Sequence, residues 1–470
     1  MPPILNQHTR VSIFTLFKQA VRGDIKDFTT GSIDRAIFLL AVPMVLEMLL
    51  ESSFAIVDIF FVNQVGAAAT STVILTEASL TILYSVAWGL AMGATALVAR
   101  RAGEKNFKDA AGIAMQAIII AAGFSLFISI IGLLFPKEIL GFMGAGKEVV
   151  ESNYHFTQLM LGSNMVIMFL FVNNGIFRGA GDASIAMRAL MIANVINIIL
   201  DPLLIKGIGP FPKMGLMGAA VATTIGRGIG VIYQFYNLFN GKDLVKLRLS
   251  QLKVKWNIIK QILDTSYGAM FQFLIGSCSW IFLARIIASG GPNVTAGYGT
   301  AIRICIFTIL PAWGIANAAA TLTGQNLGAK LPERAERSVW RSAFLAFCFF
   351  AIVGLVFFFY GQPLMQFFTS DPIAIKEGTM CLRILAIGYV FFAYGMVLSQ
   401  AFNGAGDTRT PTFVNIIAFW VVQIPLAYFL ADYMMLGSKG VYITIGVSES
   451  ILALITIWIF KKGKWKLVKV

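Results

Sequence analysis

Acidic side chains interrupt stretches of this sequence that are otherwise apolar and long enough to cross a bilayer. A charged group at bilayer depth costs at least ~2.5–3.5 kcal/mol on insertion scales, so an acid in such a place is a candidate for function. A carboxylate there can take up a proton, or it can bind a hard cation such as Na⁺ through its oxygen atoms. The second half of the chain has one acid well inside such a stretch, Glu449, whereas the first half has Glu47, Glu51, Asp58, Glu77 and Asp201.

Three of these acids share one face of a helix. At about 100° per residue, Glu47, Glu51 and Asp58 fall within roughly 40° of one another. We expect this stripe to face the interior of a helical bundle. For Asp58 a role in coupling to an ion is favoured over a structural salt bridge. For Glu47 and Glu51 a position that lines or gates a substrate cavity is an equal alternative to ion coupling.

A second polar stripe ends at Asp201. Asn194, Asn197 and Asp201 follow the i, i+3, i+7 spacing and share a helix face. Pro202 follows directly and should loosen the local helical hydrogen bonding, which would free carbonyl oxygens as further ligands. Carboxylate, amide and hydroxyl oxygens suit Na⁺, and a carboxylate pair also suits a proton. The same site could therefore use either ion, with a structural salt bridge as the alternative for Asp201.

The other charged residues in apolar stretches have simpler interpretations. We expect Glu77 near the outer end of its helix, as a solvated residue at the membrane interface. Arg285, Arg303 and Arg383 are explained more simply as structural groups in ion pairs than as an anion site.

The composition indicates helices in lipid rather than a soluble globule. Hydrophobic residues make up 57% of the chain and charged residues 13%, which is about half the ~25% charged residues of soluble domains. A bilayer-spanning helix needs about 20 mainly apolar residues. Apolar runs between breakers predict an all-α integral membrane fold with twelve such helices, at residues 36–62, 71–98, 111–134, 153–177, 185–205, 215–238, 257–288, 296–323, 338–360, 377–402, 411–432 and 440–460.

Basic residues mark alternate connections between these helices. The formal net charge is +14, and a nucleic-acid partner is excluded because the basic residues do not form one face of a folded domain. The pattern is the positive-inside rule, which predicts both termini in the cytoplasm and a multi-pass protein of the cell inner (plasma) membrane. The basic connections and tails are residues 10–35, 100–108, 242–260, 330–341 and 461–469.

The chain contains an internal repeat. Residues 87–89 (Ala-Trp-Gly) recur 225 residues later as residues 312–314, and residues 177–182 recur at the same displacement as residues 402–407. Six predicted helices separate equivalent points, so both copies enter the membrane in the same sense and are related by an axis along the membrane normal. This predicts two pseudo-symmetric six-helix bundles with a substrate cavity between them, as alternating access requires.

The repeat divides the chain into five predicted segments. They are a cytoplasmic leader with an interfacial helix (1–32), an amino-terminal six-helix lobe (33–239), a cytoplasmic linker (240–256), a carboxy-terminal six-helix lobe (257–462) and a basic tail (463–470).

The two copies have not kept the same polar residues. Four acids of the first copy are absent from the second, where a displacement of 225 residues replaces Glu47 by Gln272, Glu51 by Gly276, Asp58 by Leu283 and Asp201 by Leu426. The repeated Gly-Ala-Gly-Asp at residues 179–182 and 404–407 is explained by a tight cytoplasmic turn, which needs glycine for positive φ. A gating role for this turn is the alternative.

Residues for enzymatic chemistry are not apparent. The chain has 4 cysteines and 2 histidines, and they show neither metal-ligand spacing nor a disulfide framework. There is no Ser/His/Asp set and no phosphate-binding loop. We therefore expect no enzyme, no cofactor beyond a coupling ion, and no metal beyond Na⁺ at Asp58, Asn197 and Asp201.

These features together resemble the multidrug and toxic compound extrusion (MATE) family of cation-coupled exporters, and the likeness covers essentially the whole chain. It rests on the duplicated twelve-helix layout, on Pro43 with Asp58, on residues 177–182 and 402–407, and on residues 197–202. The resemblance implies a V-shaped pair of lobes with a cation site in the amino-terminal one.

The same resemblance implies residue roles. The cation ligands would be Asp58, Asn197 and Asp201 with a hydroxyl, most simply that of Thr223, and the same network would include Asn173 or Asn174. Cation binding would bend or repack the first helix near Pro43 and displace the substrate.

Two departures from the family pattern concern the cavity and its gates. Gln272 stands where some relatives place an acid, which argues against a second cation site in the carboxy-terminal lobe. Glu47 and Glu51 map to no family role.

The resemblance implies a monomeric antiporter that exchanges Na⁺ or H⁺ for amphipathic, often cationic organic compounds held by aromatic and methionine surfaces. The alternative is a flippase of lipid-linked oligosaccharides or polysaccharides from the same superfamily. Such proteins commonly add helices and a cation-rich cavity. Here the count stops at twelve and membrane acids outnumber central arginines, which favours drug export.

Overall fold

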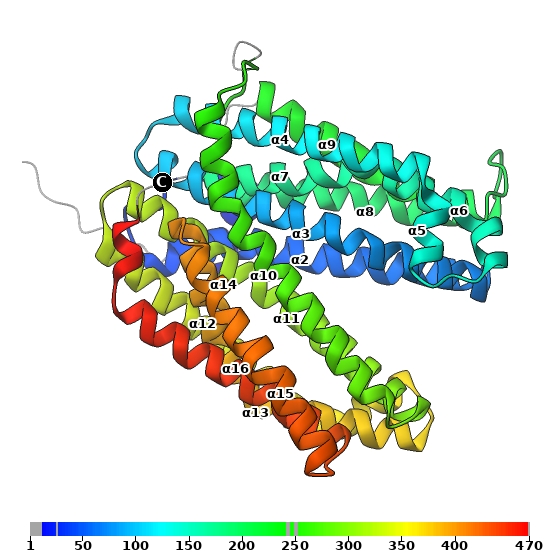
Figure 1. Cartoon of the computed structure of the whole chain (residues 1–470). Helices are drawn as coiled ribbons and strands as arrows, with labels where there is room; N and C mark the ends of the chain where they lie inside the picture. The colour runs from blue at the N-terminus through cyan, green and yellow to red at the C-terminus, as the bar shows by residue number, and fades with distance from the viewer. Residues whose placement is uncertain (1–11, 25–26, 241–244, 249–251, 469–470) are drawn as a thin grey trace, which may run out of the picture.

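Long helices arranged in two groups make up the molecule (Figure 1). Eleven of the described helical segments are long and apolar enough to cross a membrane. A twelfth long helix, α2 (Ile33–Asn63), carries Glu47, Glu51 and Asp58 and packs among them. The predicted all-α fold is therefore confirmed. The structure, a computed structural model, describes residues 12–24, 27–240, 245–248 and 252–468.

The amino-terminal lobe contains six membrane-length segments. One of them is made of two helices, α6 and α7, that meet at Ser163 and together run from residue 147 to residue 180. After α2 the helices are α3 (Ala67–Gly103), α4 (Phe107–Leu134), α5 (Pro136–Phe142), α6 (Lys147–Gly162), α7 (Asn164–Ala180), α8 (Ala183–Lys206) and α9 (Leu216–Asn240).

The carboxy-terminal lobe repeats this arrangement with one difference. The segment from residue 409 to residue 433, which corresponds to α8, contains two π-helical stretches that the sequence did not predict. The helices are α10 (Trp256–Ala288), α11 (Pro292–Gly328), α12 (Pro332–Phe368), α13 (Pro372–Ala405), α14 (Arg409–Asn415), η2 (Ile416–Gln423), α15 (Ile424–Tyr428), η3 (Phe429–Tyr433), α16 (Ser438–Lys461) and η4 (Lys464–Leu467).

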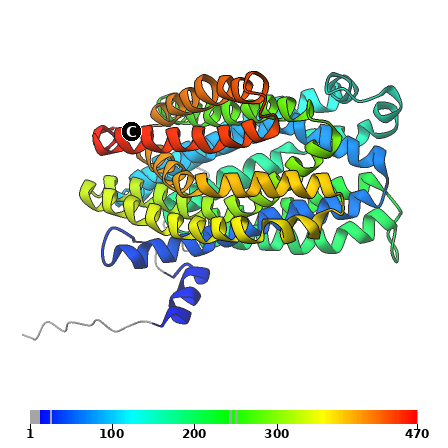
Figure 2. The same cartoon turned by 90° about the horizontal axis from the view of Figure 1, so that it is seen from below.

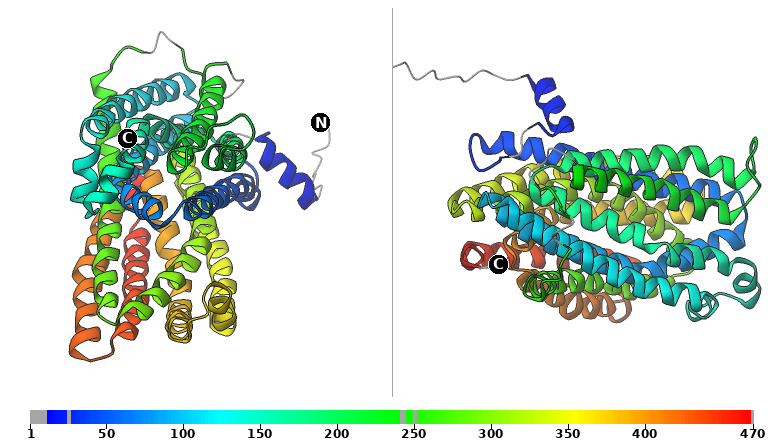
Figure 3. Two further views of the ribbon diagram at one scale, coloured as in Figure 1. Left: turned by 90° about the vertical axis from the view of Figure 1, so that its right-hand side faces the viewer. Right: turned by 90° about the horizontal axis from the view of Figure 1, so that it is seen from above.

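The lobes converge at one end of the bundle and diverge toward the other (Figures 1 and 3). We call the convergent end the basic end, because it carries the connections at residues 100–108, 330–341 and 461–466. There α2 packs on α11, and α3 packs on α10 and α11. The two lobes thus touch through the same helices of each repeat.

Glycines let the lobe backbones touch along the helices that lead to the basic end. A Cβ added to Gly314 would lie 2.6 Å from the backbone nitrogen of Val45, and one added to Gly89 would lie 2.8 Å from that of Met270. Gly89 and Gly314 are equivalent positions of the repeat, as are Val45 and Met270. The contact is therefore the same on both sides of a pseudo-twofold axis, which agrees with the predicted relation between the halves.

The repeated Gly-Ala-Gly-Asp turns have the predicted structural role. Gly181 and Gly406 end their helices with φ of 90° and 88°, a left-handed conformation that favours glycine. The hydroxyl of Ser184 donates to Asp182 at 2.6 Å, and the backbone N–H of Thr410 donates to Asp407 at 3.1 Å. Both acids therefore stabilise the start of the following helix.

The helix expected in the leader is present as α1 (Ile13–Arg22), outside the bundle at the basic end (Figure 2). Ile13 and Phe14 are exposed on it, as on a helix that lies on a membrane surface. At the other terminus Lys466 contacts Glu333 at 3.0 Å and Glu336 at 2.6 Å, and the hydrogen bond with Glu336 raises the pKa of Lys466. Parts of the predicted leader, linker and tail (1–11, 25–26, 241–244, 249–251 and 469–470) lie outside the described residues.

A candidate cation site in the amino-terminal lobe

Asn197, Asp201 and Thr223 meet where α8 packs on α9. The Asn197 amide donates to Asp201 Oδ1 at 3.2 Å and to the Thr223 hydroxyl at 3.4 Å. All three side chains are buried. The one-turn spacing of Asn197 and Asp201 brings them together on one face of α8, and α9 supplies the hydroxyl from across the helix contact.

Asp58 reaches the same place from α2, which packs on α8. Its carboxylate lies beside the Thr223 hydroxyl and close enough to Asp201 for mutual electrostatic repulsion. Glu77 of α3 also acts on Asp58, although its own side chain is exposed. Two carboxylates from different helices therefore share one site, as the sequence predicted for Asp58 and Asp201.

Three oxygen atoms of this cluster are buried and have no hydrogen-bond donor among the described residues: Oδ1 of Asp58, Oδ1 of Asn197 and Oδ2 of Asp201. Buried polar atoms normally have partners, and each exception calls for an explanation. Two neighbouring carboxylates with amide and hydroxyl oxygens form the donor set of a hard cation, and the carboxylates can alternatively bind a proton. The arrangement can therefore hold a monovalent cation or a proton between α2, α8 and α9.

Asn194 fastens α8 to α2 next to this cluster. Its amide donates to the carbonyl oxygen of Leu50 at 2.6 Å. Both α2 and α8 remain helical through their internal prolines, Pro43 and Pro202. The loosening expected at Pro202 is thus limited to the N–H that proline lacks, and α8 continues to Lys206.

Arg227 of α9 is a site residue that sequence reasoning missed. Its guanidinium lies 3.2 Å from Glu51 and 3.4 Å from the hydroxyl of Tyr84, and it stacks over the ring of Phe54 at 4.5 Å. It also acts electrostatically on Asp58. An arginine in the middle of an apolar stretch was the available signal. The structure therefore places Glu51 in an ion pair next to the candidate site.

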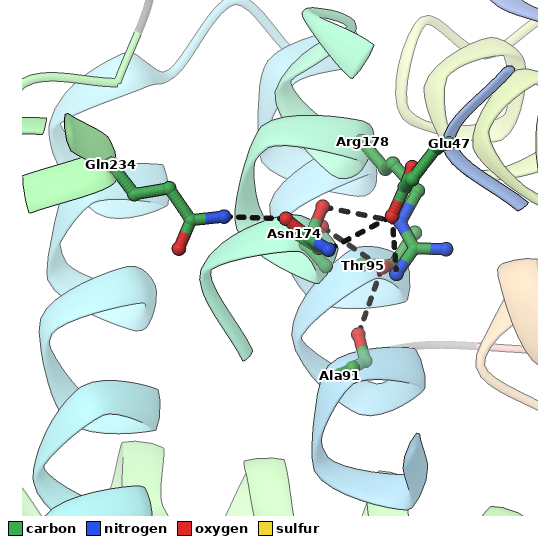
Figure 4. A network of polar contacts seen from close by, with 7 residues as sticks. Glu47, Ala91, Thr95, Asn174, Arg178 and Gln234 are labelled. Carbon is green, nitrogen blue, oxygen red and sulfur yellow. Dashed lines mark hydrogen bonds and ion pairs between the residues drawn. The ribbon is translucent and has the colours of Figure 1, made fainter. Parts of the chain in front are cut away.

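Glu47 belongs to a different cluster (Figure 4). The Asn174 amide donates to Glu47 at 2.9 Å and accepts from Gln234 at 2.5 Å, while Arg178 lies 3.8 Å from Glu47. Asn174, which was expected beside Asp58, thus contacts Glu47. Asn173 is fully buried, and neither polar atom of its amide has a hydrogen-bond partner among the described residues.

The carboxy-terminal lobe has neutral groups at the corresponding depth. Gln272 and Asn403 exchange hydrogen bonds at 3.0 and 3.2 Å. Deeper in the lobe the Ser279 hydroxyl donates to Gln423 at 2.8 Å, and the Gln423 amide donates to Ser448 at 2.9 Å. These amide and hydroxyl groups are neutral and satisfy one another, and the acid beside them in the chain is Glu449, which follows Ser448 on α16.

The arginines of the carboxy-terminal lobe do not behave as expected. Arg383 donates to the carbonyl oxygen of Phe358 at 3.0 Å. Within the described part of the chain, neither it nor Arg285 or Arg303 forms an ion pair with an acid. The expectation of ion pairs is therefore wrong for these residues, and for Arg383 a backbone carbonyl takes the place of a carboxylate.

Aromatic side chains gather where the lobes converge. The ring of Trp88 lies 5.8 Å from that of Trp313, its equivalent in the other lobe, and 6.1 Å from Phe273. Within its own lobe Trp88 contacts Phe171 at 5.3 Å. These half-buried rings offer an apolar, polarisable surface between the lobes.

Comparison with known proteins agrees with this arrangement. A sequence profile of the MatE family matches the chain twice, at residues 43–203 and 269–429, once in each lobe. The chain is 27% identical to a probable multidrug resistance protein NorM of Thermotoga maritima over 92% of this chain and 93% of that protein. It is 22% identical to an FAD transporter of Shewanella oneidensis over 90% and 94%. A solved structure described as the outward-facing conformation of a multidrug resistance MATE family transporter superposes with a TM-score of 0.87, at 27% identity over 93% of this chain and 98% of the other.

Proposed function

This chain belongs to the MatE family, whose members are transporters rather than enzymes, and on that premise we propose that it exports organic compounds in exchange for Na⁺ or H⁺. The observation that carries the proposal is the set of three buried oxygen atoms of Asp58, Asn197 and Asp201 that lack donors. A coupling cation would satisfy all three at once. At the equivalent positions of the carboxy-terminal lobe, Leu283 and Leu426 replace Asp58 and Asp201, so the amino-terminal lobe would bind the ion.

Movement of the two lobes relative to each other would open the space between them to one side of the membrane at a time. The basic end is taken as the cytoplasmic side, because positively charged connections are retained there. The lobe backbones meet at this end at Gly103 and Gly328, where an added Cβ would clash with the carbonyl oxygens of Gln325 and Arg100, so the conformation described here would face outward. Likeness to an outward-facing relative supports the assignment.

In the proposed cycle, a cation enters from outside and binds between Asp58 and Asp201. It removes the repulsion between the two carboxylates and draws α2 toward α8. Because α2 also forms the contact with α11, a change of its path near Pro43 would be passed to the other lobe. A cation can drive this change only if it binds one conformation better than the other.

The substrate surface would be the aromatic cluster between the lobes. The half-buried rings of Trp88, Trp313 and Phe273 lie against one another where the lobes meet. Aromatic faces attract organic cations as well as apolar groups. Amphipathic, often cationic compounds are therefore the proposed substrates, carried by a monomer in the plasma membrane.

The FAD transporter among the relatives raises an anionic substrate as the alternative. A phosphate group would need arginines that are free to bind it. Arg227 is held by Glu51, and Arg178 lies against Glu47 and Asn174. The arginines nearest the candidate site are thus already engaged, which favours organic cations.

Dye efflux from proteoliposomes tests the proposal. A fluorescent cationic dye would be loaded, and Na⁺ and H⁺ gradients would be imposed separately on wild type, Asp58→Asn and the control Glu449→Gln, whose carboxyl lies in the other lobe. We expect one gradient to drive efflux by wild type and Glu449→Gln, and at least tenfold slower efflux by Asp58→Asn. Gradient-driven efflux at the wild-type rate by Asp58→Asn would refute the proposal.

A further inference from the structure

Another buried carboxylate, that of Glu47, lies closer to the basic end of the amino-terminal lobe than the candidate cation site does. Glu47 precedes Asp58 by about three turns of α2, roughly 16 Å along the helix. Its side chain is 0% exposed, and its Oε2 has no hydrogen-bond partner in the part of the chain that the structure describes. The role proposed for Asp58 and Asp201 does not use this group.

Donors converge on the other oxygen of Glu47 (Figure 4). The Gln234 amide donates to Asn174 at 2.5 Å, and the Asn174 amide donates onward to Glu47 Oε1 at 2.9 Å. Arg178 adds its positive charge at 3.8 Å from the same oxygen. In this conformation the donors hold one oxygen of Glu47 and leave the other free.

The charge is not needed to pack this place in the fold. At the equivalent positions of the carboxy-terminal lobe, Gln272 replaces Glu47 and Asn403 replaces Arg178. The two amides exchange hydrogen bonds at 3.0 and 3.2 Å. The same scaffold thus accommodates a neutral pair, and the ion pair in the amino-terminal lobe calls for a different explanation.

The ion pair also adjoins the contact between the lobes. The Arg178 guanidinium lies 5.9 Å from the ring of Trp88, which contacts Trp313 of the other lobe at 5.8 Å. One half-turn before Glu47, the backbone of α2 at Val45 touches α11 at Gly314. A change in the charge of Glu47 would therefore act on residues that hold the basic end closed.

We propose that Glu47 is a second proton-binding site, and that a proton taken up there releases Arg178 and loosens the contact between Trp88 and Trp313. The proton adds to a carboxylate oxygen of Glu47 and makes it a neutral acid, while Arg178 keeps its charge and loses its partner. A buried guanidinium without a partner is costly, so Arg178 must move toward water as the lobes separate. The inference relies on the proposed antiport only for the direction of lobe movement.

A proton fits this place better than Na⁺. Arg178 would repel a second cation placed 3–4 Å away, and Na⁺ needs several oxygen ligands around it. A proton joins one oxygen atom and needs no such shell. The free Oε2 of Glu47 is therefore sufficient to bind a proton.

The charged groups around Glu47 leave Arg178 as its direct positively charged neighbour. The two groups that act on it directly are Arg178 of α7 and Glu51, one turn further along α2. Arg227 of α9 is held by Glu51 at 3.2 Å. The remaining charged side chains on helices packed against α2 are Lys18 and Arg22 of α1, Glu77, Arg100 and Arg101 of α3, Arg188, Asp201 and Lys206 of α8, Arg303 of α11, and Glu333, Arg334, Glu336, Arg337 and Arg341 of α12.

Infrared difference spectra of the purified full-length protein at acidic and alkaline pH test the proton site directly. The measurement would use an Asp58→Asn/Asp201→Asn background, so that carboxyls of the first site do not contribute. We expect a carbonyl stretching band of a protonated carboxyl group that grows on acidification and is lost on adding Glu47→Gln. An identical band in the presence of Glu47→Gln would overturn the proposal.

A double variant distinguishes loss of the proton-binding group from misfolding of the protein. Glu47→Gln alone leaves Arg178 buried without a counter-charge, whereas Glu47→Gln/Arg178→Asn copies the neutral pair that the carboxy-terminal lobe already contains. We expect the double variant to be monodisperse and to lack the band. A monodisperse double variant that keeps the band would also overturn the proposal.

Thiol labelling tests the link to the lobe contact. Asn317 of α11 is buried at 3% exposure, one turn from Trp313 on the face toward the amino-terminal lobe. With Asn317→Cys in a background without the native cysteines, acid should speed labelling by a polar maleimide, and Glu47→Gln/Arg178→Asn should abolish this pH dependence. Labelling with the same pH dependence in the double variant would overturn the link. Neither readout requires transport, so failure of dye efflux would leave both results interpretable.

Discussion

At the scale of single residues, the amino-terminal lobe concentrates charge that its partner lobe has replaced by amides and hydroxyls. Asp58 and Asp201 repel each other across a site that also contains Thr223 and the free oxygen of Asn197. Ser448 occupies the position of Thr223 in the other lobe, where it closes a neutral hydrogen-bonded chain. The repulsion between carboxylates is what an incoming cation would relieve.

The hydroxyl of Thr223 should contribute to affinity for the coupling ion. Thr223→Val keeps the shape and removes the oxygen, and a hydrogen bond or ligand contact to a charged group is worth about 1.5–3 kcal/mol. We expect the ion concentration for half-maximal dye efflux to rise about ten- to a hundredfold. Thr223→Ser is the matched control and should stay within a few-fold of wild type. Equal values for Thr223→Val and wild type would exclude the hydroxyl as a ligand.

The ion pair between Glu51 and Arg227 should stabilise the fold through charge balance. Arg227→Met leaves the partly buried Glu51 without its partner and should lower the free energy of unfolding by up to about 3 kcal/mol. Glu51→Gln/Arg227→Gln removes both charges and should recover most of the loss. Thermal unfolding of the purified variants measures both effects. A double variant no more stable than Arg227→Met would show that the loss comes from packing instead.

Helix periodicity could group Asn197 with Asp201, and the one-sided distribution of acids could single out Asp58, whereas the expectation that all three share one site came from the family resemblance. It could not assign Asn174 to Glu47, nor Arg227 to Glu51. Those pairings depend on how α7 and α9 are rotated about their axes relative to α2, and periodicity within one helix does not contain that rotation.

At the scale of helices, α2 connects the candidate site to the other lobe. Glu47, Glu51 and Asp58 lie along it, and its backbone at Val45 touches α11. Pro43 lies half a turn before that contact and removes one backbone hydrogen bond from α2. α2 thus lacks a backbone hydrogen bond close to its contact with the other lobe.

Pro43→Ala should restore the missing hydrogen bond and stiffen α2. We expect thermal stability equal to or above that of wild type, with dye efflux reduced several-fold because the helix resists a change of path. Val42→Ala, a neighbouring substitution that leaves the backbone bonding unchanged, serves as the control. Wild-type efflux by Pro43→Ala would show that α2 moves as a rigid rod.

The predicted helices correspond to the observed ones, but their ends and one internal feature do not. α3 spans Ala67–Gly103, longer than the predicted 71–98, because polar residues that extend a helix beyond the bilayer carry no hydropathy signal. The π-helical stretches at Ile416–Gln423 and Phe429–Tyr433 had no sequence signal that we recognised. An extra residue per turn depends on packing against neighbours rather than on local composition.

At the scale of the whole molecule, the lobes close one end through contacts that repeat across the pseudo-twofold axis. Gly324 faces Ala99, its own equivalent, and a Cβ added to Gly324 would lie 2.7 Å from the Ala99 Cβ. This contact therefore lies near the axis itself. The repeat in the sequence predicted two related lobes, whereas the conformation they adopt depends on the balance of contacts at their two ends.

A bulky side chain on the axis should force the closed end open. Gly324→Leu cannot fit against Ala99 without separating the lobes. We expect Asn317→Cys, in a background without the native cysteines, to react with a polar maleimide several-fold faster when Gly324→Leu is present. Gly123→Leu, where an added Cβ meets no atom within 4 Å, is the control. Equally slow labelling in all three proteins would show that the basic end does not open.

Direct binding of the coupling ion by purified protein tests the central claim, that Asp58 and Asp201 together bind it. Radioactive Na⁺ binding and proton release or uptake would be measured on wild type, Asp58→Asn, Asp201→Asn and Glu449→Gln. We predict saturable binding of one of the two ions by wild type and Glu449→Gln, and loss of that binding in both aspartate variants. Undiminished binding by Asp58→Asn and Asp201→Asn would contradict the account.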